Sequence, residues 1–233
     1  MIRTEPEAIK QGIFLKRENR FVATVLIDHI PTLVHVPNSG RMKELLIPNA
    51  PVGLMVKKGE HRKTKFQLTW IFTGQVWVNV DSLIPNKLVA AGVMAGEMAE
   101  FKGFQLEKTE VTVGNSRLDL LLAHRQTGKK LYLEVKSVTL VEEKTGKFPD
   151  APTVRGTKHL QQLEELIKDG VDGAVIFIVQ RQDAVCFRPN HETDAEFGQA
   201  LRHALAAGVR AYAYNCLVHP GMIKLNKPIP VIT

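Results

Sequence analysis

The sequence predicts a two-domain protein of mixed α+β class, with a small β-barrel over residues 1–85 and an α/β domain over residues 86–233. Short apolar runs with period-two alternation fill the first 80 or so residues, and turn-forming residues separate them. After Ile84-Pro85-Asn86 the pattern becomes helical, and helical and strand-like segments then follow one another. With 44% apolar residues, the 233-residue chain can bury a core in each domain.

The first domain contains six expected strands and most of the net positive charge. The strands cover residues 12–16, 21–27, 32–36, 52–56, 66–72 and 76–80. Residues 1–85 hold 12 Lys and Arg against 7 Asp and Glu, a net charge of +5, and the remainder of the chain contributes +2. Many short strands with a basic surface are typical of a small barrel of the OB type, which often binds nucleic-acid strands.

The second domain shows an order of elements that favours a sheet flanked by helices. The expected helices cover residues 87–99, 157–168 and 195–207, and the expected strands cover 104–113, 117–123, 131–140, 173–180, 210–217 and 222–232. An irregular, proline-rich segment is expected over residues 147–157. The first three strands form a meander, and a crossover helix then leads to a further strand.

Three charged residues lie in two apolar strands of this meander. Asp119 precedes Glu134 by fifteen residues, and Lys136 follows two residues later. Side chains alternate along a strand, so Glu134 and Lys136 share a face. A turn centred near Gln126-Thr127 places Asp119 opposite Glu134, whereas a turn centred near Thr127-Gly128 places it opposite Lys136. In either register the three charges meet on one face.

Two carboxylates in an apolar sheet repel one another and are costly to desolvate. A divalent cation, Mg²⁺ or Mn²⁺, removes both problems, and Asp119 and Glu134 are the expected metal ligands. Lys136 is then expected to help orient or deprotonate a water and to stabilise negative charge on a phosphate, which makes all three residues candidate catalytic residues. The alternative is an inter-strand salt bridge without a metal.

The start of the second expected helix supplies further candidates. Thr157 is expected to be its N-cap, and a helix N-terminus favours a phosphate. Arg155 and Lys158 are predicted phosphate contacts, and His159 and Gln162 lie on sides of the helix that can reach the site. The alternative for the two cations is an ordinary loop or surface position. The irregular segment before this helix is a candidate lid.

The remaining candidates are acids after the first helix and cations in the barrel. Glu97 and Glu100 are candidate accessory metal ligands, with a solvated helix end as the alternative. The predicted nucleic-acid contacts in the barrel are Arg41, Lys43, Lys57, Lys58, Arg62, Lys63 and Lys65. Five of these cations belong to one dense basic run, residues 57–65, for which the alternative is a solvated hairpin tip.

The second domain resembles the PD-(D/E)-x-K nuclease superfamily, and the whole chain resembles the sugar fermentation stimulation protein A family. The matching segments are residues 36–42 (VPNSGRM), 116–119 (SRLD), 134–138 (EVKSV), 148–153 (FPDAPT) and 155–160 (RGTKHL). The resemblance implies an OB-like domain, a restriction-endonuclease-like domain and DNA binding with little sequence preference. It also implies an association with the regulation of sugar, particularly maltose, metabolism.

Two functions remain open at this stage: a DNA-binding protein that acts without cleavage, and a Mg²⁺- or Mn²⁺-dependent nuclease. The DNA partner is single- or double-stranded. A transcription regulator with a sugar effector is disfavoured, because nothing in the sequence indicates a helix-turn-helix or a sugar pocket. No apolar run approaches the roughly 20 residues of a membrane span, and the first residues are too polar for a signal peptide, so a cytoplasmic protein is expected. The sequence leaves the oligomeric state open.

Overall fold

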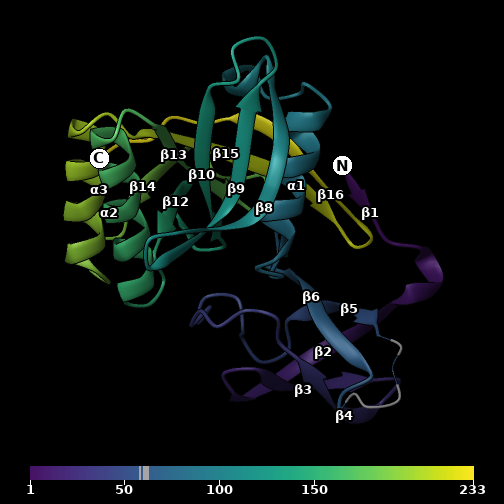
Figure 1. Ribbon diagram of the computed structural model, residues 1–233. Coiled ribbons are helices and arrows are strands. Elements are labelled where there is room, and N and C mark those ends of the chain that lie inside the picture. The colour runs from purple at the N-terminus through teal and green to yellow at the C-terminus, as the bar shows by residue number, and fades with distance from the viewer. Residues whose placement is uncertain (58, 60–62) are drawn as a thin grey trace.

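The protein has two lobes, a closed β-barrel and a larger layered domain built on one mixed sheet (Figure 1). This computed structural model describes residues 1–57, 59 and 63–233. The barrel lies at the bottom of the view in Figure 1, and the sheet and its helices lie above it. The predicted fold class, a small barrel followed by a mixed sheet flanked by helices, is therefore confirmed.

The barrel is a six-stranded sheet, five strands of which close on themselves. Its strands are β2 (Ile9–Asn19), β3 (Val22–Ile27), β4 (Ile30–His35), β5 (Pro51–Val56), β6 (Phe66–Phe72) and β7 (Trp77–Asn79). They lie in the order β4-β3-β2-β5-β6-β7, and a pairing of His35 with Gln67 joins β4 to β6. In β3, Ala23, Val25 and Ile27 are buried while their neighbours are half-buried, as the strand period predicts.

The second lobe is built on a seven-stranded mixed sheet. Its strands are β1 (Ile2–Arg3), β8 (Phe104–Val113), β9 (Ser116–His124), β10 (Lys130–Val138), β13 (Asp172–Val179), β15 (Arg210–His219) and β16 (Met222–Pro228). The order is β1-β16-β15-β13-β10-β9-β8, with β10, β13 and β15 parallel and the flanking pairs antiparallel. The central strand β13 is buried from Gly173 to Val179, which explains its unbroken apolar run.

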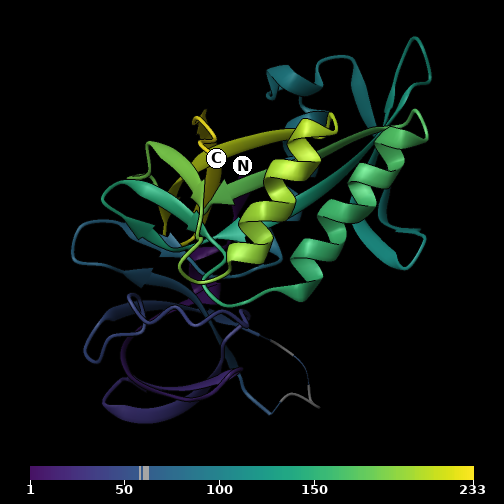
Figure 2. The same ribbon diagram turned by 90° about the vertical axis from the view of Figure 1, so that its left-hand side faces the viewer.

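Helices cover both faces of this sheet. They are α1 (Ile84–Met94), α2 (Val154–Lys168) and α3 (Ala195–Ala206), with short 3₁₀ turns at Pro6–Ala8 and Ala99–Phe101. On one face Leu88 of α1 packs in the same core as Leu133. On the other face α2 and α3 lie side by side (Figure 2), and Leu160 packs in the same core as Phe177. Of the helices in the described residues, none is long and apolar enough to cross a membrane.

The segment expected to be irregular begins as a strand. A small sheet of order β11-β12-β14 contains β11 (Val141–Glu142), β12 (Thr145–Phe148) and β14 (Cys186–Pro189). The prediction of Thr157 as N-cap is wrong: α2 begins at Val154, and the Thr153 side chain accepts a hydrogen bond from the Gly156 N–H at 3.0 Å. The sheet escaped prediction because β11 and β12 are too short to show a period, and because the pairing of β12 with the distant β14 leaves no local pattern.

Helix α1 also begins earlier than expected, at Ile84 rather than at residue 87. Pro85 lies in its first turn, where a missing N–H costs no hydrogen bond. The Asp81 carboxylate accepts the N–H of Leu83 at 3.0 Å just before the helix. The earlier start brings Asn86 into the first turn of α1.

The two lobes share a packed and hydrogen-bonded interface. Trp70 of the barrel is 2% exposed and packs in the core that α1 covers. At the end of β13, Gln180 accepts the N–H of Asn79 at 3.1 Å, and its side chain donates to the Asp81 carbonyl at 3.2 Å and to Ser137 at 3.0 Å. Strand β1, before the barrel, pairs with β16 of the large sheet. The lobes are therefore joined at several points.

Candidate metal and nucleic-acid site

Asp119 and Glu134 meet where β9 and β10 separate. The last pair of the ladder between these strands is Leu120 with Leu133, so the register places Asp119 opposite Glu134, the first of the two registers expected. Beyond this pair the Asp119 Oδ2 accepts the N–H of Val135 at 2.8 Å. A side-chain carboxylate thus replaces the main-chain acceptor that a continuing ladder would have supplied.

Glu134 is held through one of its two oxygens. The residue is 3% exposed, and its Oε1 accepts from the Lys136 Nζ at 2.6 Å and from the Nδ1 of His159 on α2. Arg155 donates to the other ring nitrogen of His159 at 3.4 Å, an arrangement that requires the proton on Nδ1. The Glu134 Oε2 is buried and has no hydrogen-bond partner among the described residues. One carboxylate oxygen therefore remains free for a ligand.

The two carboxyl groups have pKa values that move in opposite directions. Burial, followed by the nearby charge of Glu134, raises the pKa of Asp119 to about 6, against the opposing hydrogen bonds from Val135 and Asn86. Burial alone would raise the pKa of Glu134 too, but the positive Lys136 and the contact with His159 outweigh it and lower that pKa. Glu134 therefore stays ionised at neutral pH, while Asp119 is an unusually basic carboxylate.

Asn86 is a member of this site that the sequence analysis missed. Its side-chain amide, in the first turn of α1, donates to the Asp119 Oδ1 at 2.7 Å. Together with the Val135 N–H, this bond fixes the carboxylate through both oxygens. No local signal marked Asn86, because the two residues are 33 positions apart and meet only when α1 packs on the sheet.

The residues at this site fit a hard divalent cation. The free Glu134 Oε2 is a buried acceptor that lacks a donor, and the Asp119 carboxylate lies beside it. Within residues 1–57, 59 and 63–233, no group of three or more His, Cys, Asp and Glu side chains could hold a metal ion. Two carboxylates with waters completing the shell match the preference of Mg²⁺, which dehydrates reluctantly.

A basic groove borders this pair of carboxylates. The groove is a cavity of about 560 Å³ between the β8–β9 turn and the start of α2, and its lining residues include the site residue His159. Arg155 and Lys158, both predicted phosphate contacts, line it with exposed side chains. Arg117 lines the opposite wall and was not predicted. Its signal was in the sequence, because Arg117 lies two residues before Asp119 on one strand and so shares its face.

The four accessory candidates lie in different places. His159 contacts Glu134, as described above. Gln162 is half-buried and donates to Glu165 at 2.9 Å. Glu97 is exposed after α1, and Glu100 accepts the hydroxyl hydrogen of Tyr214 at 2.7 Å. Of these candidates, His159 is the one that the structure connects to the two carboxylates.

The barrel cations lie in two segments. Arg41 and Lys43 are exposed in the loop after β4, and the Arg41 carbonyl accepts from Arg17 at 2.8 Å. The cations of the β5–β6 connection form the second group: Lys57, Lys63 and Lys65 are described, whereas Lys58 and Arg62 lie outside the described residues. The groove beside Asp119 and the barrel cations are thus carried by different elements.

Comparison with known proteins identifies both lobes. The SfsA N-terminal OB domain matches residues 15–80, and the sugar fermentation stimulation protein RE domain matches residues 83–222. The sugar fermentation stimulation protein homolog of Alkaliphilus metalliredigens is 47% identical over 232 residues, which cover 99% of each chain. The homolog of Caldanaerobacter subterraneus subsp. tengcongensis is 44% identical over 225 residues, covering 96% of this chain and 97% of its own.

A solved structure agrees with this result. The structure of Pyrococcus furiosus SfsA in complex with Ca²⁺ matches with a TM-score of 0.92 and 29% identity, and the match covers 100% of both chains. The expected OB-like barrel and restriction-endonuclease-like domain are thereby confirmed. The chain belongs to the sugar fermentation stimulation protein A family.

Proposed function

We propose that this protein binds DNA with little sequence preference in the groove beside Asp119 and Glu134, and that these two carboxylates hold Mg²⁺ or Mn²⁺. The observation that carries the proposal is the state of Glu134, which is buried with Oε1 held by Lys136 and His159 and with Oε2 free. Such an acceptor is costly unless a ligand uses it. The Ca²⁺ complex of the Pyrococcus furiosus relative supports a hard, oxygen-seeking cation.

The groove suits the phosphate backbone rather than base edges. Arg117, Arg155 and Lys158 supply charged donors for phosphate oxygens, which position a nucleic acid without reading its sequence. The net charge of +7 adds a long-range attraction for a polyanion. We assign the regulatory association with sugar, particularly maltose, metabolism to this DNA binding, in the cytoplasm, with single- or double-stranded DNA as the partner.

Hydrolysis of DNA phosphodiesters is the second candidate function, and the position of Lys136 favours it. A divalent cation, when bound, supplies a Lewis acid for a phosphoryl oxygen and lowers the pKa of a bound water. Asp119 is kept in place by Asn86 and Val135, which orients its oxygens. The Lys136 Nζ lies 2.6 Å from Glu134 Oε1 and would supply a fixed positive charge to a phosphate held beside the two carboxylates.

Cation binding is tested by thermal unfolding with and without Mg²⁺, Mn²⁺ or Ca²⁺. A ligand at 100 times its Kd stabilises the folded state by about 2.7 kcal/mol, so saturating cation should raise the Tm of the wild type clearly. Asp119→Ala is expected to abolish the shift. Glu164→Ala, which removes a half-buried carboxylate on α2 that pairs with Lys168, is the control and should keep it. An equal shift in the Asp119→Ala protein would refute the assigned site.

Cleavage is tested with labelled single- and double-stranded DNA and each cation. If the protein is a nuclease, Asp119→Ala and Lys136→Ala should each lower the rate by about 10²-fold or more, as loss of transition-state stabilisation predicts. DNA that stays intact while binding weakens steeply with salt supports binding without cleavage. Cleavage that survives in Asp119→Ala comes from a contaminant, and salt-independent binding would rule out the proposed groove.

A further inference from the structure

Two segments singled out in the sequence, residues 36–42 and 148–153, lie outside the carboxylate pair and the groove described above, and the structure brings them together. The Asp150 Oδ2 accepts the main-chain N–H of Met42 at 3.2 Å. A Cβ added to Gly40 would lie 2.4 Å from the same oxygen, so the loop can approach only because residue 40 has no side chain. The barrel and the sheet domain thus meet at Asp150.

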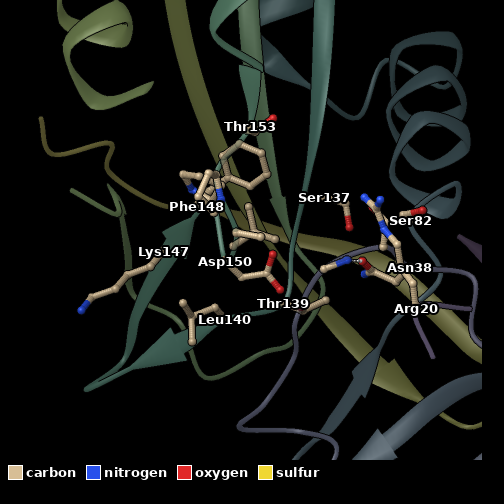
Figure 3. A pocket seen from close by; sticks show the side chains of 16 residues that line it. Arg20, Asn38, Ser82, Ser137, Thr139, Leu140, Lys147, Phe148, Asp150 and Thr153 are labelled. Atoms are coloured by element: carbon tan, nitrogen blue, oxygen red, sulfur yellow. Dashed lines mark hydrogen bonds between the residues drawn. The ribbon is translucent and has the colours of Figure 1, made fainter. Parts of the chain in front are cut away.

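This meeting point is one wall of a cavity between the lobes (Figure 3). The cavity measures about 230 Å³ and reaches from the β2–β3 turn of the barrel to the segment before α2. Ser137, one of its lining residues, follows the site residue Lys136 directly in β10. Thr153, another lining residue, is the N-cap of the helix that carries His159. Two elements that line the cavity, β10 and α2, therefore also carry residues of the carboxylate site.

The walls of the cavity combine two cations, Arg20 and Lys147, with hydroxyl groups, an acid and apolar rings, and Lys147 already pairs with Glu142. Arg20, Ser82 and Ser137 lie on one side in Figure 3, and Asp150 and Phe148 lie on the other. Arg20 is exposed, and among the described residues its guanidinium forms no hydrogen bond or ion pair; it lies 5.5 Å from the centroid of the Phe21 ring and near the positive Arg17. The Arg20 donors are therefore available to an anionic ligand.

The volume of the cavity limits the size of the ligand that it can hold. A volume of 230 Å³ equals the liquid share of about eight water molecules. It lies below the roughly 300–1,000 Å³ of pockets for drug-sized ligands, so the cavity holds one base or one sugar-phosphate unit and not a base pair. Apolar contact from Phe148, Pro149 and Pro152 suits the face of a base, and Asp150 can accept from ring or amino N–H groups at its edge.

We propose that this cavity receives the base of one unpaired nucleotide of the DNA strand that lies at the Asp119–Glu134 site, while the phosphate of that nucleotide stays at the exposed Arg20. Arg20 holds its phosphate, and the base lies between the Phe148 side and Asp150. The phosphate belongs on the Arg20 side, because the Asp150 carboxylate repels it. The inference rests on the proposed function and deepens it: the preferred substrate is DNA with an unpaired end or flap rather than a continuous duplex.

Binding measurements with two labelled duplexes test the inference. One duplex is blunt, the other carries a short unpaired tail, and both are titrated by fluorescence anisotropy in Ca²⁺ with the full-length protein. The wild type should bind the tailed duplex about tenfold more tightly, the size of one charged hydrogen bond to a phosphate. Arg20→Ala should remove this preference while leaving affinity for the blunt duplex unchanged. Arg202→Ala, an exposed arginine of α3 outside the cavity, is the matched control and should retain the preference.

The outcomes separate this inference from the proposed function. If the wild type binds the two duplexes with equal affinity and steep salt dependence, the proposed role of the cavity is refuted, whereas binding in the groove is still supported. Equal weakening of both duplexes by Arg20→Ala also overturns it, because Arg20 would then be a general phosphate contact. If the wild type binds neither duplex, both proposals fail. Circular dichroism spectra of the three proteins exclude misfolding as the cause of a lost preference.

Discussion

The barrel and the sheet domain place their charges differently. In the barrel, an ion pair such as Lys10 with Asp28 lies at the surface, with side chains 46% and 70% exposed. In the sheet domain, Glu134 and Lys136 form a pair whose side chains are 3% and 9% exposed. Because desolvating two charges costs several kcal/mol, folding alone does not favour the buried pair. The comparison teaches that a buried charge needs a specific partner or ligand, whereas an exposed charge contributes mainly to long-range attraction.

The largest expected effect on stability comes from breaking the buried pair. Glu134→Ala leaves Lys136 buried without its partner carboxylate, and should lower the free energy of unfolding by about 3–5 kcal/mol. Lys10→Ala removes the exposed pair in the barrel and should cost less than about 1 kcal/mol. Urea unfolding of both variants at pH 7 in EDTA checks the contrast. Similar losses in the two variants would mean that burial does not distinguish these pairs.

The second-largest expected effect is a gain in stability, on removal of the Asp119 charge. The pKa of Asp119 rises from 3.8 to about 6 on folding, so the ionised side chain destabilises the metal-free protein by on the order of 3 kcal/mol. Below pH 3.8 the group is protonated in both states and the effect vanishes. Stability is lost as the pH rises towards 6, and the loss is complete above it.

Asp119→Asn should therefore stabilise the metal-free protein above pH 6 and have little effect near pH 4. Asn keeps a carbonyl oxygen for the Val135 N–H. Unfolding in EDTA at several pH values measures the difference, and saturating Mg²⁺ should reverse it, because the variant loses a metal ligand. A stabilisation that does not depend on pH would show that relief of the buried charge is not its cause.

A smaller effect is expected where the two lobes meet. Gly40→Ala introduces a Cβ 2.4 Å from Asp150, and overpacking of this kind typically costs about 1–3 kcal/mol. The cost should fall when Gly40→Ala is combined with Asp150→Ala, because the second change makes room. A double-mutant cycle by urea unfolding measures this coupling. If the two losses of unfolding free energy are strictly additive, the cost of Gly40→Ala does not come from contact with Asp150.

The smallest expected changes concern single phosphate contacts in the groove. Arg155→Ala and Lys158→Ala should each reduce the slope of log K against log salt by about 0.9, the release of one counterion. Lys168→Ala is the control, because this residue belongs to the same helix and pairs with Glu164 at its far end. Binding of duplex DNA across a salt series gives the slopes. An equal change of this slope in the Lys168→Ala protein would show that the phosphate contacts are not confined to the groove.

The parts of the fold that were predicted well depend on local patterns. Strand β3 follows from alternation over six residues, and β13 follows from an unbroken apolar run. The small sheet of β11, β12 and β14 and the start of α2 were missed. The small sheet depends on the parallel pairing of β12 with β14, and neither strand is long enough to show a period of its own. The start of α2 depends on Thr153, which caps the helix four residues before the expected position.

The residues of the candidate site also fall into a predicted group and a group that was missed. Asp119, Glu134 and Lys136 were found because hairpin register and strand alternation relate residues that are close in sequence. The other contacts depend on tertiary packing. The packing of α1 and α2 on the sheet brings Asn86 to Asp119 and His159 to Glu134, and the separation of β9 from β10 leaves the Val135 N–H to Asp119. The cavity at Arg20 and Asp150 requires both lobes, so no single stretch of sequence predicts it.

The sequence by itself determined the two-domain class and the face on which three charged residues meet, because periodicity and spacing act within one hairpin or one helix. The family was indicated separately, by the resemblance of several short segments. Only the tertiary structure decided that Glu134 keeps one free oxygen, that Asn86 steadies Asp119, and that a cavity opens between the lobes. Those features arise from contacts between segments tens of residues apart. Their geometry is set by the packing of whole helices and sheets, which no local pattern records.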